Sequence, residues 1–297
     1  MATIAFVVHP ERLEAAAIAR QGATWLEERG HVVVEVWDAG PPEDGPTVAG
    51  RGVATGMPGP SPAFDATVDL AVSLGGDGTM LRTVALACTH GTPVLGVNLG
   101  RLGYLTEVEP DGLEPALERF LSGQYTVEER VTLEVAVERG GSATTPDDRR
   151  IVVLNEAVVE KTVPGHTIRV AASIAGRPFV TYAADGLLVA TPTGSTAYNL
   201  SARGPILSPG LRAVVLTPVS PHMLFDRPLV LDPEQWVRLE LLGPRPAVLV
   251  LDGQSSDALE PGDAVVCRVS PSPARLVTFG PRHFFSILRA RFHLADR

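Results

Sequence analysis

Residues 72–82 combine an apolar run, a glycine turn that holds one carboxylate, and the start of a helical pattern. The turn reads Gly75-Gly76-Asp77-Gly78-Thr79. Glycines let the backbone turn sharply and approach a ligand closely, and a helix start offers free N–H groups and partial positive charge that favour phosphate. A lone carboxylate there is suited to accept the proton of a hydroxyl that attacks a phosphoryl group. The segment therefore predicts a strand–turn–helix unit of a kinase.

The first part of the chain alternates strand-like and helix-like patterns. Apolar periodicity predicts helices at residues 11–29, 79–88 and 113–121. Strands are expected at four apolar runs: Ile4–Val8, Val32–Trp37, Asp69–Leu74 and Pro93–Val97. This alternation predicts a parallel sheet with right-handed crossovers, covered on both faces. Residues 39–62 are dense in glycine and proline and are expected to form a mobile surface loop.

The pattern changes near Tyr125, where short strand-like runs replace the alternation. Short strands at this spacing predict an antiparallel sandwich or twisted sheet. The runs cover residues 131–138, 151–160, 167–174, 179–184, 187–190, 213–216, 237–242, 247–251, 264–269 and 276–279. A hairpin loop is expected at 140–148, and helices at Ser195–Arg203 and at His283–Phe292.

The chain of 297 residues is long enough for two domains. We expect an α/β domain of residues 1–124, with the helix of residues 281–297 packed back on it, and a β-rich domain of residues 125–280. The net charge of -9 argues against broad binding of nucleic acid or of anionic membranes. No apolar run reaches the roughly 20 residues that span a bilayer. The first residues also lack a signal-peptide pattern, so a cytoplasmic protein is expected.

Residues that commonly bind metals are not grouped in the sequence. The seven histidines lack HxH or HExxH spacing, so a metal site built from protein side chains is not expected. Cys88 and Cys267 lie far apart in apolar settings and are expected to be buried free thiols. The chain has neither a Walker A motif nor GxGxxG, which excludes two common modes of nucleotide binding, and it has no GxSxG elbow of a serine hydrolase.

A polar pair, Asn155-Glu156, interrupts the apolar run from Ile151 to Val159. The pair faces either solvent, on an edge strand or bulge, or a ligand. In the second case the carboxylate would accept hydrogen bonds from ribose hydroxyls and the amide would read a base or ribose.

The densest group of polar residues is Asp185–Asn199. Asp185-Gly186 predicts a turn between strands, and the run Thr191–Thr196 supplies hydroxyl and N–H groups just before a helix. Such an arrangement is suited to bind an anion. Tyr198, on the first helical turn, could stack on a base. The alternative is a capped helix that follows a proline-containing loop.

Two shorter motifs are compatible with plain loops. Asn98–Gly103 follows a strand end and offers Arg101 as a phosphate partner. Asp252-Gly253-Gln254 is typical of a hairpin turn, because Asp-Gly is a common turn pair.

Together these segments resemble those of NAD kinases, the ATP-NAD 2′-phosphotransferases. The resemblance covers the chain from about Val72 to the terminal helix, and it rests on an ordered set of motifs: Gly75–Thr79, Asn98–Leu105, Asn155-Glu156, Asp185-Gly186, Thr191–Tyr198 and Asp252–Gln254. The first motif is shared with diacylglycerol, sphingosine and 6-phosphofructokinase-like kinases, whereas the run from Asp185 to Tyr198 is far more specific. The chain departs from the family pattern at Ala183-Ala184, where many members carry a polar residue, and at Phe225-Asp226.

The resemblance implies an α/β N-terminal domain and a β-rich C-terminal domain, with NAD bound between them. Asp77 would be the general base on the 2′-hydroxyl of the adenosine ribose. The implied NAD-binding residues are Asp77, Gly78, Arg82, Asn155, Glu156, Asp185, Thr196, Ala197, Tyr198, Asn199, Ser201 and Gln254. The implied phosphate and ATP region comprises Gly75, Gly76, Thr79, Asn98, Arg101, Thr193 and Ser195.

The resemblance also implies Mg²⁺, or another divalent metal, that arrives on the phosphates of ATP, and a homodimer or homotetramer. Polyphosphate is an alternative donor and NADH an alternative acceptor. A lipid or sugar kinase with the same glycine turn would need an apolar groove or sugar-binding acids. A non-catalytic NAD(P)-binding sensor would lack Asp77 or the hydroxyl-rich loop, and both are present.

Overall fold

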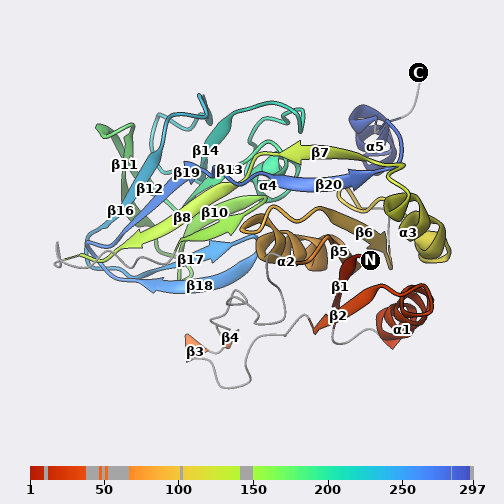
Figure 1. Cartoon of the computed structure of the whole chain (residues 1–297). Coiled ribbons are helices and arrows are strands. Elements are labelled where there is room, and N and C mark those ends of the chain that lie inside the picture. The colour runs from red at the N-terminus through yellow and green to blue at the C-terminus, as the bar shows by residue number, and fades with distance from the viewer. Residues whose placement is uncertain are drawn as a thin grey trace. The chain divides into compact units, whose positions relative to one another are not determined.

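The structure is a computed structural model that describes residues 1–9, 13–37, 47–48, 51–52, 67–100, 103–140, 150–281 and 283–294. The chain forms two compact units. The first unit comprises residues 1–40, 60–130 and 274–297, and the second comprises residues 41–59 and 131–273. Figure 1 labels the helices and strands of the chain.

A six-stranded sheet with the order β2-β1-β5-β6-β20-β7 forms the centre of the first unit. Its strands are β1 (Thr3–Val8), β2 (Val32–Trp37), β5 (Leu70–Gly75), β6 (Val94–Asn98), β7 (Thr126–Arg130) and β20 (Ala274–Thr278). The helices of this unit are α1 (Leu13–Glu27), α2 (Asp77–Cys88), the 3-10 helix η1 (Pro110–Gly112), α3 (Leu113–Leu121) and α5 (Phe284–Arg291). The sheet is parallel from β2 to β20. It is mixed overall, because β7 runs antiparallel to β20.

Both faces of this sheet are covered, as the continuous apolar strands predict. Alternate residues of β1, including Ile4 and Phe6, share one core cluster with Leu26 of α1 and Leu117 of α3. An intervening residue, Val7, is also fully buried, and α2 contacts β5, β6 and β20. The strand that leads into the glycine turn, β5, is buried at every position. The glycine turn therefore follows directly on a strand that is fully packed on both faces.

Some boundaries in the first unit differ from the sequence-based expectation. Helix α2 begins at Asp77 rather than Thr79, because the extended residue before the helix is Gly76 (φ -102°, ψ -167°). Within the expected loop at 39–62 the structure describes only the antiparallel pair β3 (Thr47–Val48) and β4 (Arg51–Gly52). The rest of that loop, and most of the hairpin loop expected at 140–148, lie outside the described residues.

Two six-stranded antiparallel sheets form the second unit. The first, here called the β10 sheet, has the order β15-β14-β13-β10-β17-β18 and consists of β10 (Glu156–Lys161), β13 (Gly186–Ala190), β14 (Val214–Val219), β15 (Leu229–Leu231), β17 (Ala247–Leu251) and β18 (Gln254–Leu259). The second, here called the β8 sheet, has the order β12-β11-β16-β19-β8-β9 and consists of β8 (Leu133–Glu138), β9 (Ile151–Val153), β11 (Ile168–Ile174), β12 (Arg177–Ala184), β16 (Val237–Leu242) and β19 (Ala264–Val269). Side chains of both sheets share one core cluster. The predicted α/β domain and β-rich sandwich are confirmed.

The run expected as one strand over residues 151–160 is divided. Residues 151–153 belong to the β8 sheet as β9, and residues 156–161 belong to the β10 sheet as β10, so the chain changes sheets at Leu154-Asn155. The polar pair therefore marks a crossing between sheets. Strand β18 was not expected because its sequence is mostly polar, and the short β15 was also missed. The expected helix at 195–203 is a 3-10 turn, η2 (Gly194–Thr196), followed by the short α4 (Tyr198–Ser201).

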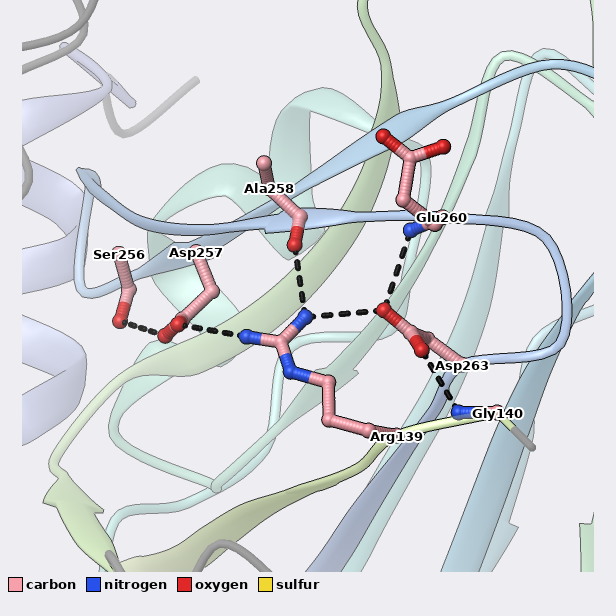
Figure 2. A network of polar contacts seen from close by, with 7 residues as sticks. All are labelled: Arg139, Gly140, Ser256, Asp257, Ala258, Glu260 and Asp263. Atoms are coloured by element: carbon pink, nitrogen blue, oxygen red, sulfur yellow. Dashed lines mark hydrogen bonds and ion pairs between the residues drawn. The ribbon is translucent and has the colours of Figure 1, made fainter. Parts of the chain in front are cut away.

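An arginine at the end of β8 links the two sheets of the second unit (Figure 2). Arg139 donates to the Asp263 carboxylate at 2.9 Å, to the Asp257 carboxylate at 3.0 Å and to the carbonyl of Ala258 at 2.8 Å. Asp263 also accepts the backbone N–H of Gly140 and of Glu260. Burial raises the pKa of Asp263, but these hydrogen bonds outweigh burial and hold the pKa below its ordinary value. This network ties β8 of one sheet to β18 of the other.

The two cysteines agree with the expectation from the sequence. Cys88 in the first unit and Cys267 in the second are buried free thiols, as expected. Burial raises the pKa of the Cys267 thiol to about 12, which keeps it protonated and unreactive. None of the helices in the described parts of the chain is long and apolar enough to cross a membrane.

Candidate active site

The glycines of the 75–79 turn have different local roles. A Cβ atom on Gly75 would collide with the side chain of Thr79, so this glycine is needed for packing. A Cβ atom on Gly76 or Gly78 would meet no described atom within 4 Å. These two positions therefore leave the backbone at the start of α2 open to a close-lying ligand.

Asp77 is the first residue of α2, and its two carboxylate oxygens have different surroundings. Oδ2 lies 3.4 Å from the backbone N–H donor of Tyr104 and 3.7 Å from Nη1 of Arg291. Oδ1 is buried beside Gly103, where a Cβ would collide with it, and it has no hydrogen-bond partner among the described residues. The side chain is 33% exposed. The carboxylate is therefore held at a helix start and can still be reached by a ligand.

The ends of β5 and β6 bring further polar groups beside this turn. Gly75 pairs with Asn98 across the two parallel strands. The amide of Asn98 donates to the carbonyl of Gly100 at 3.3 Å and to the Glu109 carboxylate at 3.1 Å. Thr79 Oγ1 and Asn98 Oδ1 are buried, without a partner in the described part of the chain. Arg82 lies further along α2, and Arg101 falls outside the described residues.

In the second unit, Asp252 holds the point where the chain changes sheets. Asp252 and Gly253 form the two-residue turn between β17 and β18, and both have a positive φ, 47° and 80°. The Asp252 carboxylate accepts the backbone N–H groups of Leu154 at 2.8 Å, Asn155 at 2.8 Å and Glu156 at 3.1 Å. The Asp252 N–H donates in return to the carbonyl of Glu156 at 3.0 Å. One carboxylate thus satisfies the donors that the strand break leaves unpaired.

The hydroxyl-rich loop packs on the same crossing. The hydroxyl of Thr191 donates to the carbonyl of Leu154 at 2.6 Å, and its N–H donates to the carbonyl of Asn155 at 2.9 Å. A Cβ atom on Gly194 would collide with the backbone of Asn155, so the approach of these segments requires glycine. The structure therefore brings together three motifs that are far apart in the sequence: Asn155-Glu156, Thr191–Ser195 and Asp252-Gly253.

Glu156 is a buried acid at the centre of this arrangement. The residue is 4% exposed, and its Oε2 has no hydrogen-bond partner among the residues that the structure describes. Burial, and to a lesser extent the Asp252 carboxylate, raises the pKa of Glu156 to about 8, against an opposing hydrogen bond from the backbone N–H of Tyr198. Burial also raises the pKa of Asp252 to about 6, although its three backbone hydrogen bonds lower it. Glu156 is therefore protonated at neutral pH and can donate as well as accept.

We predict that this raised pKa makes stability depend on pH. Below pH 4.5, the ordinary pKa of the group, Glu156 is protonated in both folded and unfolded chains. Between that value and a folded pKa of about 8 only the folded chain keeps the proton. The stabilisation is thus lost as pH rises towards 8, with a slope of at most about 1.4 kcal/mol per pH unit.

The Glu156→Gln variant, which mimics the protonated acid, is the control for this prediction. Urea unfolding of the ligand-free proteins between pH 6 and 8 should show the wild type losing stability relative to the variant. The pKa of Asp252 is about 6, so the comparison of wild type and variant starts at pH 6. Parallel stability curves of the two proteins would contradict the assignment.

Tyr198 and Asp185 are already paired with other side chains of the second unit. The Tyr198 ring packs on an apolar cluster that includes Leu188, and its hydroxyl donates to Glu160. Burial and the neighbouring carboxylates, Glu160 above all, raise the pKa of Tyr198. Lys161 forms a 2.7 Å ion pair with Asp185, and both side chains stay partly exposed.

Two predicted ligand contacts have their polar groups bonded within the fold. The Asn199 amide donates to the carbonyls of Ser195 and Pro205 and accepts from Thr217. The Ser195 hydroxyl bonds to both the N–H and the carbonyl of Leu207. Both side chains are fully buried, so they hold the loop in shape.

The remaining predicted residues differ in exposure. Thr193 is buried, and its hydroxyl is without a partner among the residues described. Thr196 donates to the carbonyl of Thr193 at 3.4 Å, and Ala197 is partly buried beside it. Ser201 is exposed at the end of α4, and Gln254 follows the Asp252-Gly253 turn at the start of β18.

Comparison with known proteins identifies the family. Residues 59–125 match the ATP-NAD kinase N-terminal domain, and residues 154–279 match the ATP-NAD kinase C-terminal domain. An NAD kinase of Heliobacterium modesticaldum is 44% identical over 98% of both chains. The chain belongs to the ATP-NAD kinase family.

Two solved structures share the fold. The NAD kinase of Archaeoglobus fulgidus, solved in complex with ATP, aligns with a TM-score of 0.69 at 26% identity over 99% of this chain and 100% of its own. The yeast NADH kinase, solved with NADH, aligns with a TM-score of 0.81 at 24% identity over 100% of this chain and 89% of its own. As an NAD kinase family member, the chain is an enzyme that phosphorylates NAD with ATP.

Two residues of this NAD kinase fold were not predicted as site residues. Asp252 was interpreted as part of a hairpin turn and of a family motif, without a role in the site, yet its carboxylate holds the Asn155-Glu156 segment. The Asp-Gly pair in the sequence predicts the turn that contains Asp252. It does not predict which backbone N–H groups the Asp252 carboxylate accepts. Arg291 of α5 lies beside Asp77. No local pattern could predict that contact, since the two residues are far apart in the sequence.

Proposed function

We propose that the chain transfers the γ-phosphoryl group of ATP to the 2′-hydroxyl of the adenosine ribose of NAD, with Asp77 as the general base. The observation that carries this proposal is the carboxylate of Asp77, fixed at the start of α2 beside the open glycines Gly76 and Gly78. The 2′-oxygen attacks the γ-phosphorus, the bond to the β–γ bridging oxygen breaks, and the 2′-hydroxyl proton passes to Asp77. Phosphoryl transfer needs mainly positioning and charge stabilisation, so a rigid turn suits it.

The second unit supplies recognition of the dinucleotide in this proposal. Asn155 and Glu156 hold ribose and adenine edges, and Asp185 reaches the nicotinamide side. Glu156 suits this role because its buried Oε2 lacks a partner among the described residues, and a protonated acid can both donate to and accept from ribose hydroxyls. Ser195, predicted in the phosphate region, and Asn199, predicted to bind NAD, have polar groups that bond within the fold, and we propose that they position the loop.

The substrate is proposed to be the magnesium complex of ATP, with polyphosphate as an alternative donor and NADH as an alternative acceptor. The described residues contain no group of three or more His, Cys, Asp or Glu that could hold a metal. We propose that Mg²⁺ stays on the donor phosphates and its own waters. The metal would neutralise charge that develops on the phosphates.

The family resemblance also supports proposals about the domains, the location in the cell and the oligomeric state. We propose that the two compact units correspond to the α/β and β-rich domains, with α5 part of the first. We also propose a cytoplasmic protein and a homodimer or homotetramer. Sedimentation of the purified protein would establish the number of copies.

The proposed reaction predicts two products in equal amounts. Purified protein with NAD, Mg²⁺ and ATP should form NADP, detected by an NADP-specific dehydrogenase, together with one ADP per NADP. Parallel reactions with polyphosphate and with NADH identify the preferred donor and acceptor. ATP consumption without NADP, or phosphate attached at another hydroxyl, would contradict the proposal.

A further inference from the structure

Helix α5 brings an arginine to the carboxylate at the glycine turn. Arg291, in the last turn of α5, places Nη1 3.7 Å from Oδ2 of Asp77. Its guanidinium carbon lies 4.6 Å from the centre of the Tyr104 ring, and Phe284 from the start of α5 lies 6.4 Å from the same ring. Tyr104 in turn directs its backbone N–H at Asp77. All four residues belong to the first unit.

A purely structural ion pair explains the contact between Arg291 and Asp77 poorly. The 3.7 Å separation is longer than a hydrogen bond. The side chains of Arg291 and Asp77 are 46% and 33% exposed, and ion pairs at such exposure contribute little to stability. Stacking on Tyr104 instead fixes the direction of the guanidinium in advance. The result is a fixed cation, open to solvent, beside the proposed base.

A cation in this position suits the charge of the reaction. During transfer, negative charge develops on the γ-phosphoryl oxygens while the 2′-oxygen loses its proton to Asp77. A planar guanidinium binds phosphate oxygens through two parallel N–H donors, which an ammonium cannot do. Arginines that act on a transferred phosphoryl group accelerate such reactions by large factors.

We propose that Arg291 is a further catalytic residue, whose guanidinium binds the γ-phosphoryl group of the donor beside Asp77. Helix α5 then completes the phosphate end of the active site. Arg291 keeps its proton throughout, and only Asp77 exchanges one. This inference rests on the proposed role of Asp77, and the experiment below separates the two.

The test compares Arg291→Ala and Arg291→Lys with a matched control, Arg119→Ala. Arg119 is also an exposed arginine of the first unit, stacked 4.5 Å over the Phe279 ring and bonded to the carbonyl of Phe279. Each of the two alanine variants therefore loses a cation–aromatic contact. Circular dichroism and thermal unfolding establish that each variant is folded before kinetics are measured.

Arg291→Ala should lower kcat/KM for MgATP about 100-fold or more, as the loss of a group that stabilises transition-state charge does, while the Kd of NAD changes less than about threefold. Arg291→Lys should recover only part of the loss. Added guanidinium ion should restore turnover to Arg291→Ala and not to Asp77→Asn. Arg119→Ala should stay within about threefold of wild type.

Several results would overturn the inference. One is a folded Arg291→Ala variant with normal MgATP kinetics, and another is an equal loss in Arg119→Ala. The Kd of MgATP, measured by calorimetry, tests Arg291 even if the wild type forms no NADP. An unchanged Kd and unchanged turnover in Arg291→Ala would reject the role of Arg291 and leave the proposed function standing. Absence of NADP from the wild type would reject the proposed function.

Discussion

The Asp77→Asn variant is expected to lose turnover by about 10²–10⁴-fold, the range typical for removal of a general base. The amide keeps the shape of the side chain, and its oxygen can still accept the Tyr104 N–H. It cannot take up the proton that the 2′-hydroxyl must release. The expected loss therefore lies in kcat, measured as the initial rate of NADP formation at saturating NAD and MgATP.

Asp69→Asn is the matched control for this variant. Asp69 is also a carboxylate of the first unit that accepts a backbone N–H, that of Thr3 at 2.8 Å. Its replacement should leave the rate near that of the wild type. If Asp77→Asn kept a near wild-type rate, Asp77 would be a group that orients the hydroxyl at most, and the proposed base would have to be sought elsewhere.

The second large effect is expected from Asp252→Asn. One carboxylate accepts three backbone N–H groups at the crossing between sheets, and an amide would turn an NH₂ group towards at least one of them. An unsatisfied buried donor costs about 1–3 kcal/mol, so the free energy of unfolding should fall by about 3 kcal/mol. Urea titration measures this loss. The released Asn155-Glu156 segment should also raise the KM for NAD about tenfold or more.

Asp263→Asn separates loss of stability from loss of recognition. Asp263 also accepts two backbone N–H groups of the second unit, but it lies in the Arg139 network of Figure 2. This variant should lose stability by a similar amount and keep the KM for NAD. If both variants raised KM equally, the effect of Asp252 would be general weakening of the fold. Unchanged stability and KM in Asp252→Asn would reject its role altogether.

Much of the fold could be predicted because local patterns determine it. The buried run that became β5 and the amphipathic pattern of α3 carry clear periodicities. Strand β18 was missed because Gln254–Leu259 is mostly polar, and its pairing with β17 decides its structure. The division of residues 151–160 between two sheets was also missed. It depends on hydrogen bonds from Asp252, which is almost one hundred residues away.

The candidate site could be predicted as a set of motifs but not as an arrangement. The glycine turn and Asp77 are local signals, and the structure places them at the end of β5 as the motif requires. The convergence of Asn155-Glu156, Thr191–Ser195 and Asp252 is set by long-range hydrogen bonds. The bonded amide of Asn199 could not be foreseen either, because its partners include Pro205 of the loop and Thr217 of β14, which only the folded unit brings together.

Asp77 of the first unit is proposed to carry the chemistry, and the second unit is proposed to recognise the dinucleotide. Calorimetric titration of NAD into Asp77→Asn and Asp252→Asn tests this division directly. We expect the Kd of Asp77→Asn to stay within about threefold of wild type and that of Asp252→Asn to rise about tenfold or more. The reverse order, with NAD binding lost in Asp77→Asn and kept in Asp252→Asn, would contradict the account.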